Sequence, residues 1–271
     1  MDRQRAIAGV FDRAAATYDA VGVSMFGPIA EQLVARLAPQ PGERLLDVGC
    51  GRGAVLIRAA RMVGPTGRAA GLDLSPAMVD AARREAAEAG VAVDVMVGDA
   101  ADPDLPPHSF DVVASSLVLF FLPDLVGALR AWRGLLVPGG RVGVTTFGGY
   151  GDAWAAVDAT VMSRAPAGMR DPRLRDPEGP FASDEAMERL FGEAGLTDIA
   201  SVTSVIPVRF EDEDQWYRWS WSLGQRGVWE TLSQSERDTV RADAYERLQD
   251  CRDDRGRIGF DQEVRCTLAV R

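Results

Sequence analysis

The sequence predicts an α/β fold in which helices cover both faces of a mostly parallel sheet. Between residues 45 and 147, short apolar runs of strand length alternate with segments whose apolar residues recur at helical spacing. A turn with glycines at alternate positions, Gly49, Gly51 and Gly53, joins the first apolar run to the first helical segment. Such a turn brings backbone N–H groups and a helix N-terminus close to one point, with no Cβ atoms in the way of a nucleotide-like ligand.

The predicted elements follow this pattern along the chain. Residues 4–37 should form two or three helices, interrupted at Gly27-Pro28. Strands are expected at 45–49, 68–73, 93–98, 110–116, 140–147, 197–210 and 262–271. Helices are expected at 53–63, 75–89, 124–136 and 183–194, with two more between 211 and 257. The stretch 148–180 is rich in Gly, Pro, Asp and Arg, which predicts a long loop without elements of its own, typical of an active-site cover or a flexible insert.

Composition narrows the class of protein. The 271 residues hold 40 acidic against 30 basic side chains, and a net charge of −10 argues against a nucleic-acid partner. The three cysteines, Cys50, Cys251 and Cys266, lie far apart, as in a reduced chain without a disulfide framework. The first residues lack the apolar centre of a signal peptide, and the longest apolar stretch, 112–123, is too short to cross a membrane. We therefore expect a soluble cytoplasmic protein with no nucleic-acid or membrane partner.

Residues after the glycine turn narrow the identity of its ligand. In the dinucleotide fingerprint the third glycine comes one residue later, and a phosphate-binding loop would carry a Lys-Ser/Thr pair. Asp73 ends the next strand, 24 residues after Gly49, where a carboxylate can accept hydrogen bonds from two ribose hydroxyls. The alternative for Asp73 is to cap the following helix, although Ser75 is the better cap. Both a nicotinamide dinucleotide and S-adenosylmethionine carry such a ribose.

A second acidic residue distinguishes these two cofactors. Asp99 and Ala100 follow the third strand, where the carboxylate can accept a hydrogen bond from an adenine amino group and the N–H of Ala100 can donate to the ring. Dinucleotide folds have no need of this pair. Two further motifs precede the fourth and fifth strands, Ser109-Phe110-Asp111 and Pro138-Gly139-Gly140.

Taken in order, these motifs resemble those of class I S-adenosylmethionine-dependent methyltransferases, in particular the ubiquinone/menaquinone-biosynthesis and bacterial small-molecule branch. The motifs are Asp47-Val48-Gly49-Cys50-Gly51-Arg52-Gly53, Gly71-Leu72-Asp73-Leu74-Ser75, Gly98-Asp99-Ala100, Ser109-Phe110-Asp111 and Pro138-Gly139-Gly140. The resemblance covers residues 11–147 well and 183–271 only by topology. It implies a Rossmann-like sheet of seven strands, S-adenosylmethionine as cofactor and S-adenosylhomocysteine as product.

The resemblance also implies where the cofactor lies. The turn residues Gly49, Cys50 and Gly51 would pass under its methionine part, and Asp73 would bind the ribose hydroxyls. The remaining cofactor-binding residues would be Leu74 and Met78 on the faces of the adenine, Asp99 and Ala100 at its edge, and the backbone of Ser115 at the amino-acid end.

A division of the chain is implied by the same resemblance. Residues 1–40 would form an N-terminal helical lid, 41–210 and 258–271 the core, and 148–182 and 211–257 insertions that cap the acceptor site. Residues 11–19 are similar to the family's lid segment, in which a tyrosine, here Tyr18, often meets the cofactor carboxylate. The alternative is that Tyr18 only packs against a helix.

The chemistry places few demands on side chains. A sulfonium is already electrophilic, so the protein has to hold the acceptor in line with the S–CH₃ bond. The single histidine, His108, precedes a strand and so lies at the wrong end of the sheet. Many relatives carry a histidine after the fourth strand, where this chain has Leu119-Phe120-Phe121-Leu122. An acceptor that is already acidic or nucleophilic, such as a phenol, an enol, a carboxylate or an electron-rich carbon, would fit this lack of a histidine. The alternative is that a Glu, Asp or Tyr from the insertions serves as the base, and no catalytic residue or metal ligand is predicted.

The acceptor pocket is predicted to be apolar. Trp216, Trp219 and Leu223 would share one helical face, and Phe120 would join them from beyond the fourth strand. The alternative is that the tryptophans only fix a cap helix to the sheet. In both cases a cap this apolar favours an aromatic, polyketide-, terpenoid- or quinone-like acceptor.

The sequence thus predicts an enzyme that transfers a methyl group to oxygen or carbon of a small apolar metabolite, as a monomer or homodimer. A methyltransferase-like protein that keeps the cofactor but catalyses a non-methylating reaction such as cyclisation is the alternative. An NAD-dependent oxidoreductase is disfavoured by the position of the third glycine and by Asp99.

Overall fold

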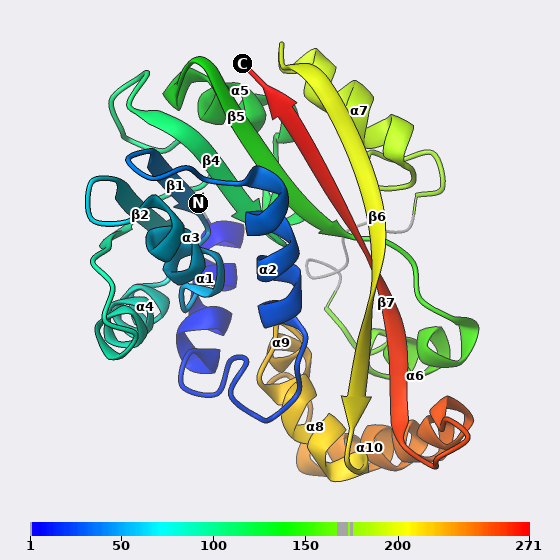
Figure 1. Cartoon of the computed structure of the whole chain (residues 1–271). Helices are drawn as coiled ribbons and strands as arrows, with labels where there is room; N and C mark the ends of the chain where they lie inside the picture. Colours follow the sequence, from blue (N-terminus) through cyan, green and yellow to red (C-terminus); the bar gives the residue numbers. More distant parts are fainter. Residues whose placement is uncertain (1, 167–172, 174–175) are drawn as a thin grey trace. The chain divides into compact units, whose positions relative to one another are not determined.

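The computed structural model describes residues 2–166, 173 and 176–271 (Figure 1). These residues form two compact units. Unit 1 takes the described parts of 1–25, 149–172 and 205–263, and unit 2 those of 26–148, 173–204 and 264–271. Unit 1 therefore gathers segments that we assigned to the lid and to the two insertions. Two strands, β6 (Thr197–Phe210) and β7 (Ile258–Val270), have one part in each unit.

The sheet has seven strands in the order β3-β2-β1-β4-β5-β7-β6, which confirms the predicted fold class. Strands β1 to β5 run parallel, and β7 pairs with β5 in the antiparallel sense. The first five strands are β1 (Arg44–Val48), β2 (Arg68–Asp73), β3 (Asp94–Val97), β4 (Phe110–Ser116) and β5 (Leu136–Phe147). The strand order reverses at β1, so the crevice beyond the carboxyl ends of β1 and β4 is where such a sheet binds its ligand.

Helices cover both faces of the sheet in unit 2. One face is covered by α2 (Phe26–Leu37), α3 (Ala54–Val63) and α4 (Pro76–Glu88), whose buried side chains form one core cluster with β1, β2 and β4. The other face is covered by α5 (Leu125–Leu135) and α7 (Asp184–Glu193) (Figure 1). On α3 the buried residues Val55, Leu56 and Ala59 recur three or four apart, the spacing that predicted a helix after the glycine turn.

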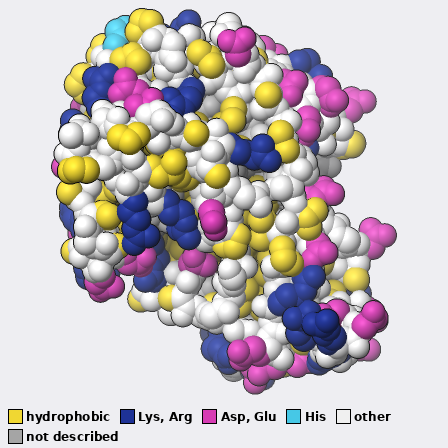
Figure 2. Space-filling model, in the orientation of Figure 1, with side chains coloured by type: hydrophobic (Ala, Val, Ile, Leu, Met, Phe, Trp, Pro, Cys, Tyr) yellow, Lys and Arg dark blue, Asp and Glu magenta, His cyan; other side chains and the backbone are white. Residues whose placement is uncertain are grey.

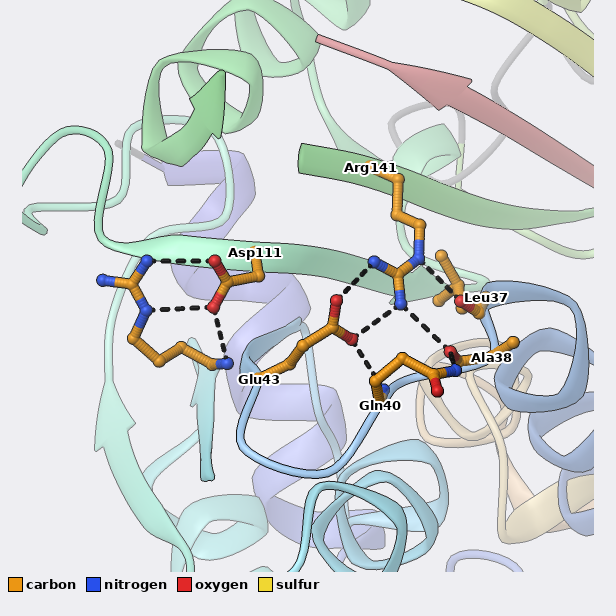
Figure 3. Close-up of polar contacts among 7 residues, drawn as sticks. Leu37, Ala38, Gln40, Glu43, Asp111 and Arg141 are labelled. Carbon is orange, nitrogen blue, oxygen red and sulfur yellow. Dashed lines mark hydrogen bonds and ion pairs between the residues drawn. The ribbon is translucent and has the colours of Figure 1, made fainter. Parts of the chain in front are cut away.

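Two arginines fix the amino ends of the central strands (Figure 3). The carboxylate of Asp111 on β4 accepts hydrogen bonds from the backbone N–H and the guanidinium of Arg44 on β1, at 2.8 to 3.1 Å. On β5, Arg141 donates to Glu43 and to the carbonyl of Leu37. The bonds from Arg44 hold the pKa of Asp111 below its ordinary value, and those from Arg141 do the same for Glu43. The Asp111 motif is thus structural and lies at the edge opposite to the glycine turn.

The prediction that residues 148–180 lack elements of their own is wrong. They contain the helix α6 (Asp152–Met162), which buries Trp154, Val157 and Val161 in unit 1. These three residues have helical spacing, but the Gly- and Pro-rich flanks obscured it. Residues 167–172 and 174–175 of the predicted insertion lie outside the described residues.

The segment 211–257 holds three α-helices where two helices were predicted: α8 (Glu213–Trp221), α9 (Arg226–Trp229) and α10 (Gln234–Leu248), which continues into the 3₁₀ turn η4 (Gln249–Cys251). Because α8 ends at Trp221, Leu223 does not share a helical face with Trp216 and Trp219, and that prediction is also wrong. The chain leaves the helix at Ser222, the C-cap, before it reaches Leu223.

Aromatic rings form much of the core of unit 1. Trp154 stacks on Phe260 with ring centroids 3.8 Å apart and on Phe210 at 5.7 Å, and Trp219 meets Phe210 edge-on at 5.3 Å. The N-terminal helix α1 (Asp2–Ala14) is tied to this unit by a bidentate ion pair between Arg13 and Glu230. The insertions therefore build a folded unit with its own core.

The molecular surface carries charges of both signs. On the face drawn in Figure 2, basic side chains lie interspersed with acidic ones. Among the described residues, every helix is too short or too polar to span a bilayer.

Candidate cofactor-binding site

The glycine turn leaves β1 at Val48 and is held against β2. The N–H groups of Gly49 and Cys50 both donate to the carbonyl of Leu72, at 2.8 and 2.9 Å. Gly49, Gly51 and Gly53 have φ angles of 72°, 51° and 93°, in the left-handed region that other residues rarely adopt. The Cys50 thiol is buried, and burial raises its pKa well above the ordinary value, so Cys50 does not present a thiolate at the turn.

Gly49 and Gly51 are glycines for different reasons. A Cβ on Gly49 would lie 2.3 Å from Cγ2 of Val118, so this position is closed by the loop that follows β4. A Cβ on Gly51 would meet nothing within 4 Å, so this position faces open space. The turn is therefore closed by the protein at Gly49 and open to a ligand at Gly51.

Asp73 lies beside the open glycine. One carboxylate oxygen accepts a hydrogen bond from the N–H of Gly51 at 2.8 Å, and the other accepts one from the N–H of Ser75 at 2.9 Å. Ser75 is the N-cap of α4, since its hydroxyl accepts from the N–H of Met78 at 3.1 Å. Ser75 therefore takes the helix-capping role that was the alternative for Asp73. Gly51 and Asp73, which lie 22 residues apart in the sequence, are joined by one hydrogen bond.

Asp47 is a buried carboxyl in the first motif, and no role was predicted for it. It lies on β1 with 1% of its surface exposed, and neither carboxyl oxygen has a hydrogen-bond partner among the described residues. Burial is the main cause that raises the pKa of Asp47 to about 8, and the nearby Asp73 carboxylate contributes in the same direction. In the sequence, this buried carboxyl is indicated by an acidic residue inside the apolar run of a predicted strand.

Replacing Asp47 by asparagine is expected to stabilise the free protein more at pH 8 than at pH 5. The folded-state pKa of about 8 lies above the ordinary value of 3.8, so the contribution of Asp47 to wild-type stability is most favourable below pH 3.8 and becomes less favourable as the pH rises toward 8. Asparagine does not titrate, so its advantage should grow over this window to the order of 2–5 kcal/mol. Urea denaturation of both proteins at pH 5, 6, 7 and 8 measures the difference, and a difference independent of pH would contradict the assigned burial.

The predicted adenine-edge residues follow β3, next to β2. The N–H of Gly98 donates to the carbonyl of Asp73 at 3.0 Å, which brings Asp99 to the same edge of the sheet as the turn. Asp99 accepts from the N–H of Ala101 at 2.8 Å, and the Ala100 carbonyl accepts from the indole of Trp132 at 2.7 Å. The contacts of Asp99 and Ala100 with adenine stay predictions.

Two more of the predicted cofactor-binding residues stand on or beside α4. Leu74 directly precedes the N-cap and is half-buried. Met78 lies in the first turn of α4 and is 2% exposed, so the core covers most of its side chain. Their contacts with the adenine faces stay predictions as well.

The loop after β4 completes this edge. The hydroxyl of Ser115 donates to the carbonyl of Val48 at 3.0 Å and so ties the ends of β4 and β1 together. Leu117 has a positive φ of 60° and begins a sharp change of direction. Phe120, in the 3₁₀ turn η1 (Leu119–Phe121), then stacks on Phe147 at 5.6 Å and meets Phe181 edge-on at 6.4 Å. Aromatic side chains thus line the carboxyl ends of β4 and β5.

The other predicted site residues belong to unit 1. Tyr18 meets Phe11 edge-on at 5.9 Å. Trp216 and Trp219 are 1% and 6% exposed and contact aromatic rings of their own unit. Such packing is what the alternative interpretations of Tyr18 and the tryptophans predicted. Contacts of these residues or of Leu223 with the cofactor or the acceptor stay predictions.

His108 lies at the amino end of β4, as predicted. Its Nδ1 is 3.0 Å from the carbonyl of Leu136, and the Arg271 guanidinium contacts both groups. No group of His, Cys, Asp and Glu residues within the described part of the chain could hold a metal ion.

The strand order of the sheet reverses beside the glycine turn, and a carboxylate lies at the end of the next strand. These two features define a nucleoside-binding α/β protein. Residues 45–140 match the family model described as a methyltransferase domain. Nocamycin O-methyltransferase of Saccharothrix syringae is 38% identical over 245 residues, which cover 86% of this chain and 88% of that protein. The chain therefore belongs to the class I S-adenosylmethionine-dependent methyltransferases, and S-adenosylmethionine is its cofactor.

One further relative agrees with this assignment, and one solved structure shares the fold. Aklanonic acid methyltransferase DauC of Streptomyces sp. (strain C5) is 44% identical over 144 residues, 53% of this chain and 66% of that protein. The crystal structure of the YcgJ protein from Bacillus subtilis has the same fold, with a TM-score of 0.59 at 19% identity over 90% of this chain and 98% of that one.

The residues at the turn fit such a cofactor. Gly51 leaves open space above the backbone, and the Asp73 carboxylate beside it favours a ligand that carries positive charge. The glycine turn and Asp73 are thus the groups that would hold the nucleoside.

Proposed function

We propose that this enzyme transfers the methyl group of S-adenosylmethionine to an oxygen atom of a small, apolar, polyketide-like metabolite. The observation that carries the proposal is the 38% identity to nocamycin O-methyltransferase along 88% of that protein. The likeness to aklanonic acid methyltransferase supports the same class of acceptor. These names state what the two relatives act on, and we expect the acceptor of this chain to be a compound of a similar kind.

The proposed roles of the residues rest on the geometry of unit 2. When bound, the cofactor supplies a methyl group on positively charged sulfur, which needs no further activation. Gly51 and Asp73 hold the nucleoside at the switch point of the sheet, and the rings of Phe120, Phe147 and Phe181 provide an apolar wall at the ends of β4 and β5. Orientation of this kind can supply roughly 7–11 kcal/mol of the barrier.

The acceptor is proposed to supply its own acidity. The stretch Leu119-Phe120-Phe121-Leu122 after β4 carries no ionisable side chain, and the single histidine lies at the opposite edge. A phenol, an enol or a carboxylic acid loses its proton near neutral pH more readily than an alcohol, so it needs no strong base held by the protein. An enolic or phenolic hydroxyl of a polyketide fits this requirement.

The test is turnover with a panel of acceptors. The protein is incubated with S-adenosylmethionine and phenols, enols, carboxylic acids and simple alcohols, and S-adenosylhomocysteine is measured by mass spectrometry. We expect turnover with the acidic hydroxyls and not with the alcohols, and ¹³C-methyl NMR should place the label on oxygen. A methyl group on carbon would contradict the proposed atom, and consumption of an acceptor without change in its mass would favour the cyclase alternative.

Trp219 tests whether unit 1 contributes to acceptor binding. Because the ring packs on Phe210 in the core, we propose the conservative change Trp219→Phe, which keeps an aromatic ring. The expected result is a rise of about two- to tenfold in the KM for the acceptor, with the dissociation constant of the cofactor unchanged. Trp229→Phe is the matched control, since Trp229 is fully buried in the same unit, and it should lower only the Tm. If Trp219→Phe behaves like this control, Trp219 serves packing alone.

A further inference from the structure

One ion pair joins the glycine turn to α4. The front of the turn is fixed to β2 by the bonds to Leu72 and Asp73. Within Gly51-Arg52-Gly53, the N–H of Gly53 donates to the carbonyl of Cys50 at 2.8 Å, and the two glycines have no side chains that could add a further anchor. Arg52 carries the one side chain of this tripeptide, and its Nε donates to a carboxylate oxygen of Glu85 on α4 at 2.5 Å.

The position of Glu85 makes this contact more than a surface ion pair. The side chains of Arg52 and Glu85 are 24% and 35% exposed, so both are partly shielded from water. A Cβ on Gly53 would lie 3.7 Å from that of Ala82, one turn before Glu85, so this face of α4 runs directly beside the turn. The same helix begins at Ser75, whose N–H binds Asp73. The pair therefore connects the turn to the helix that carries the other side of the site.

We infer that Arg52 and Glu85 are positioning residues, which hold the glycine turn in the conformation that binds the cofactor. Glycines populate many backbone conformations, and each restraint on them reduces the entropy that ligand binding has to remove. The inference rests on the proposed placement of the cofactor at the turn. It predicts that loss of the pair weakens binding of S-adenosylmethionine and S-adenosylhomocysteine in parallel, since both share the nucleoside and differ in charge at sulfur.

The experiment measures the dissociation constants of both nucleosides by titration calorimetry for wild type, Glu85→Gln, Arg52→Gln and the double variant. Glu85→Gln should raise both constants about two- to fivefold. In the Arg52→Gln background the same change should have no further effect, as expected for residues that act as a pair. Arg68→Gln is the matched control: its ion pair with Asp94, at 2.7 Å, lies at the amino ends of β2 and β3, and both affinities should stay unchanged.

Three results would overturn the inference. They are unchanged constants for Glu85→Gln, additive effects in the double variant, and weaker binding of S-adenosylmethionine alone, which would indicate a charge effect on the sulfonium. Asp73→Ala, measured alongside, separates this failure from failure of the proposed placement. If Asp73→Ala weakens binding and Glu85→Gln does not, only the role of the pair is wrong. If neither weakens binding, the cofactor does not lie at the turn.

Discussion

A variant with alanine in place of Gly51 is expected to fold and to bind S-adenosylmethionine roughly tenfold or more weakly. The new Cβ would meet no protein atom within 4 Å, so the fold accommodates it at the cost of a positive φ of 51°. That conformation costs an alanine about 1–2 kcal/mol. The same Cβ would occupy the space in which we place the cofactor, so the loss should fall on binding and not on folding.

The measurement is calorimetric titration with S-adenosylmethionine beside thermal unfolding without it. Gly90→Ala is the matched control, because Gly90 also has a positive φ, 69°, and open space around its Cβ, but lies beyond the far end of α4. Both variants should lose similar stability, and only Gly51→Ala should lose affinity. Gly49 is a poorer probe, since its Cβ would run into Val118. Equal affinity in the two variants would contradict a cofactor above the turn.

Replacing Asp73 by alanine is expected to weaken S-adenosylmethionine binding about ten- to a hundredfold, the value of a charged hydrogen bond of roughly 1.5–3 kcal/mol. Part of the loss should come from the turn itself, because the Asp73 carboxylate accepts the N–H groups of Gly51 and Ser75. Titration calorimetry again gives the affinity, and thermal unfolding gives the stability.

Asp111→Ala is the control for this variant. Asp111 also accepts a backbone N–H, from Arg44 at 2.8 Å, but at the opposite edge of the sheet. Its loss should lower the Tm and leave the affinity unchanged. If Asp73→Ala and Asp111→Ala both affect only stability, then Asp73 has a structural role and the ribose lies elsewhere.

Much of the sheet was predictable because each strand is a short apolar run between clear breaks. Strands β2, β4 and β6 have the predicted bounds, 68–73, 110–116 and 197–210. By contrast, β5 begins at Leu136, ahead of the predicted 140. We took Pro138-Gly139-Gly140 to precede this strand, but Leu136 already pairs with Phe110, and the register then shifts so that Val112 pairs with Arg141. A local pattern of Pro and Gly does not reveal such a pairing.

The helix α6 was missed for a related reason. Its apolar face depends on Trp154, Val157 and Val161, which are buried against the aromatic core of unit 1. The tertiary contact, more than the local sequence, makes this segment a helix. The glycine nearest to the end of α8, Gly224, comes after Leu223, so it did not indicate that the helix ends before that residue.

The site was predictable where chain order alone brings residues together. The carboxyl ends of parallel strands share one edge, so Gly51, Asp73 and Asp99 had to lie near one another. The orphaned oxygens of Asp47 and the contact of Val118 with Gly49 depend on packing between segments far apart in the sequence. No pattern of residue types specifies such contacts. The predicted roles of Tyr18 and the tryptophans concern another unit, and sequence spacing does not relate one unit to the other.

A crystal structure with S-adenosylhomocysteine would show whether the nucleoside lies at the glycine turn. We expect the ribose hydroxyls within hydrogen-bond distance of the Asp73 carboxylate and the homocysteine chain above Gly51. A nucleoside bound away from the carboxyl ends of β1 and β2, with the space above Gly51 filled only by water, would contradict this placement.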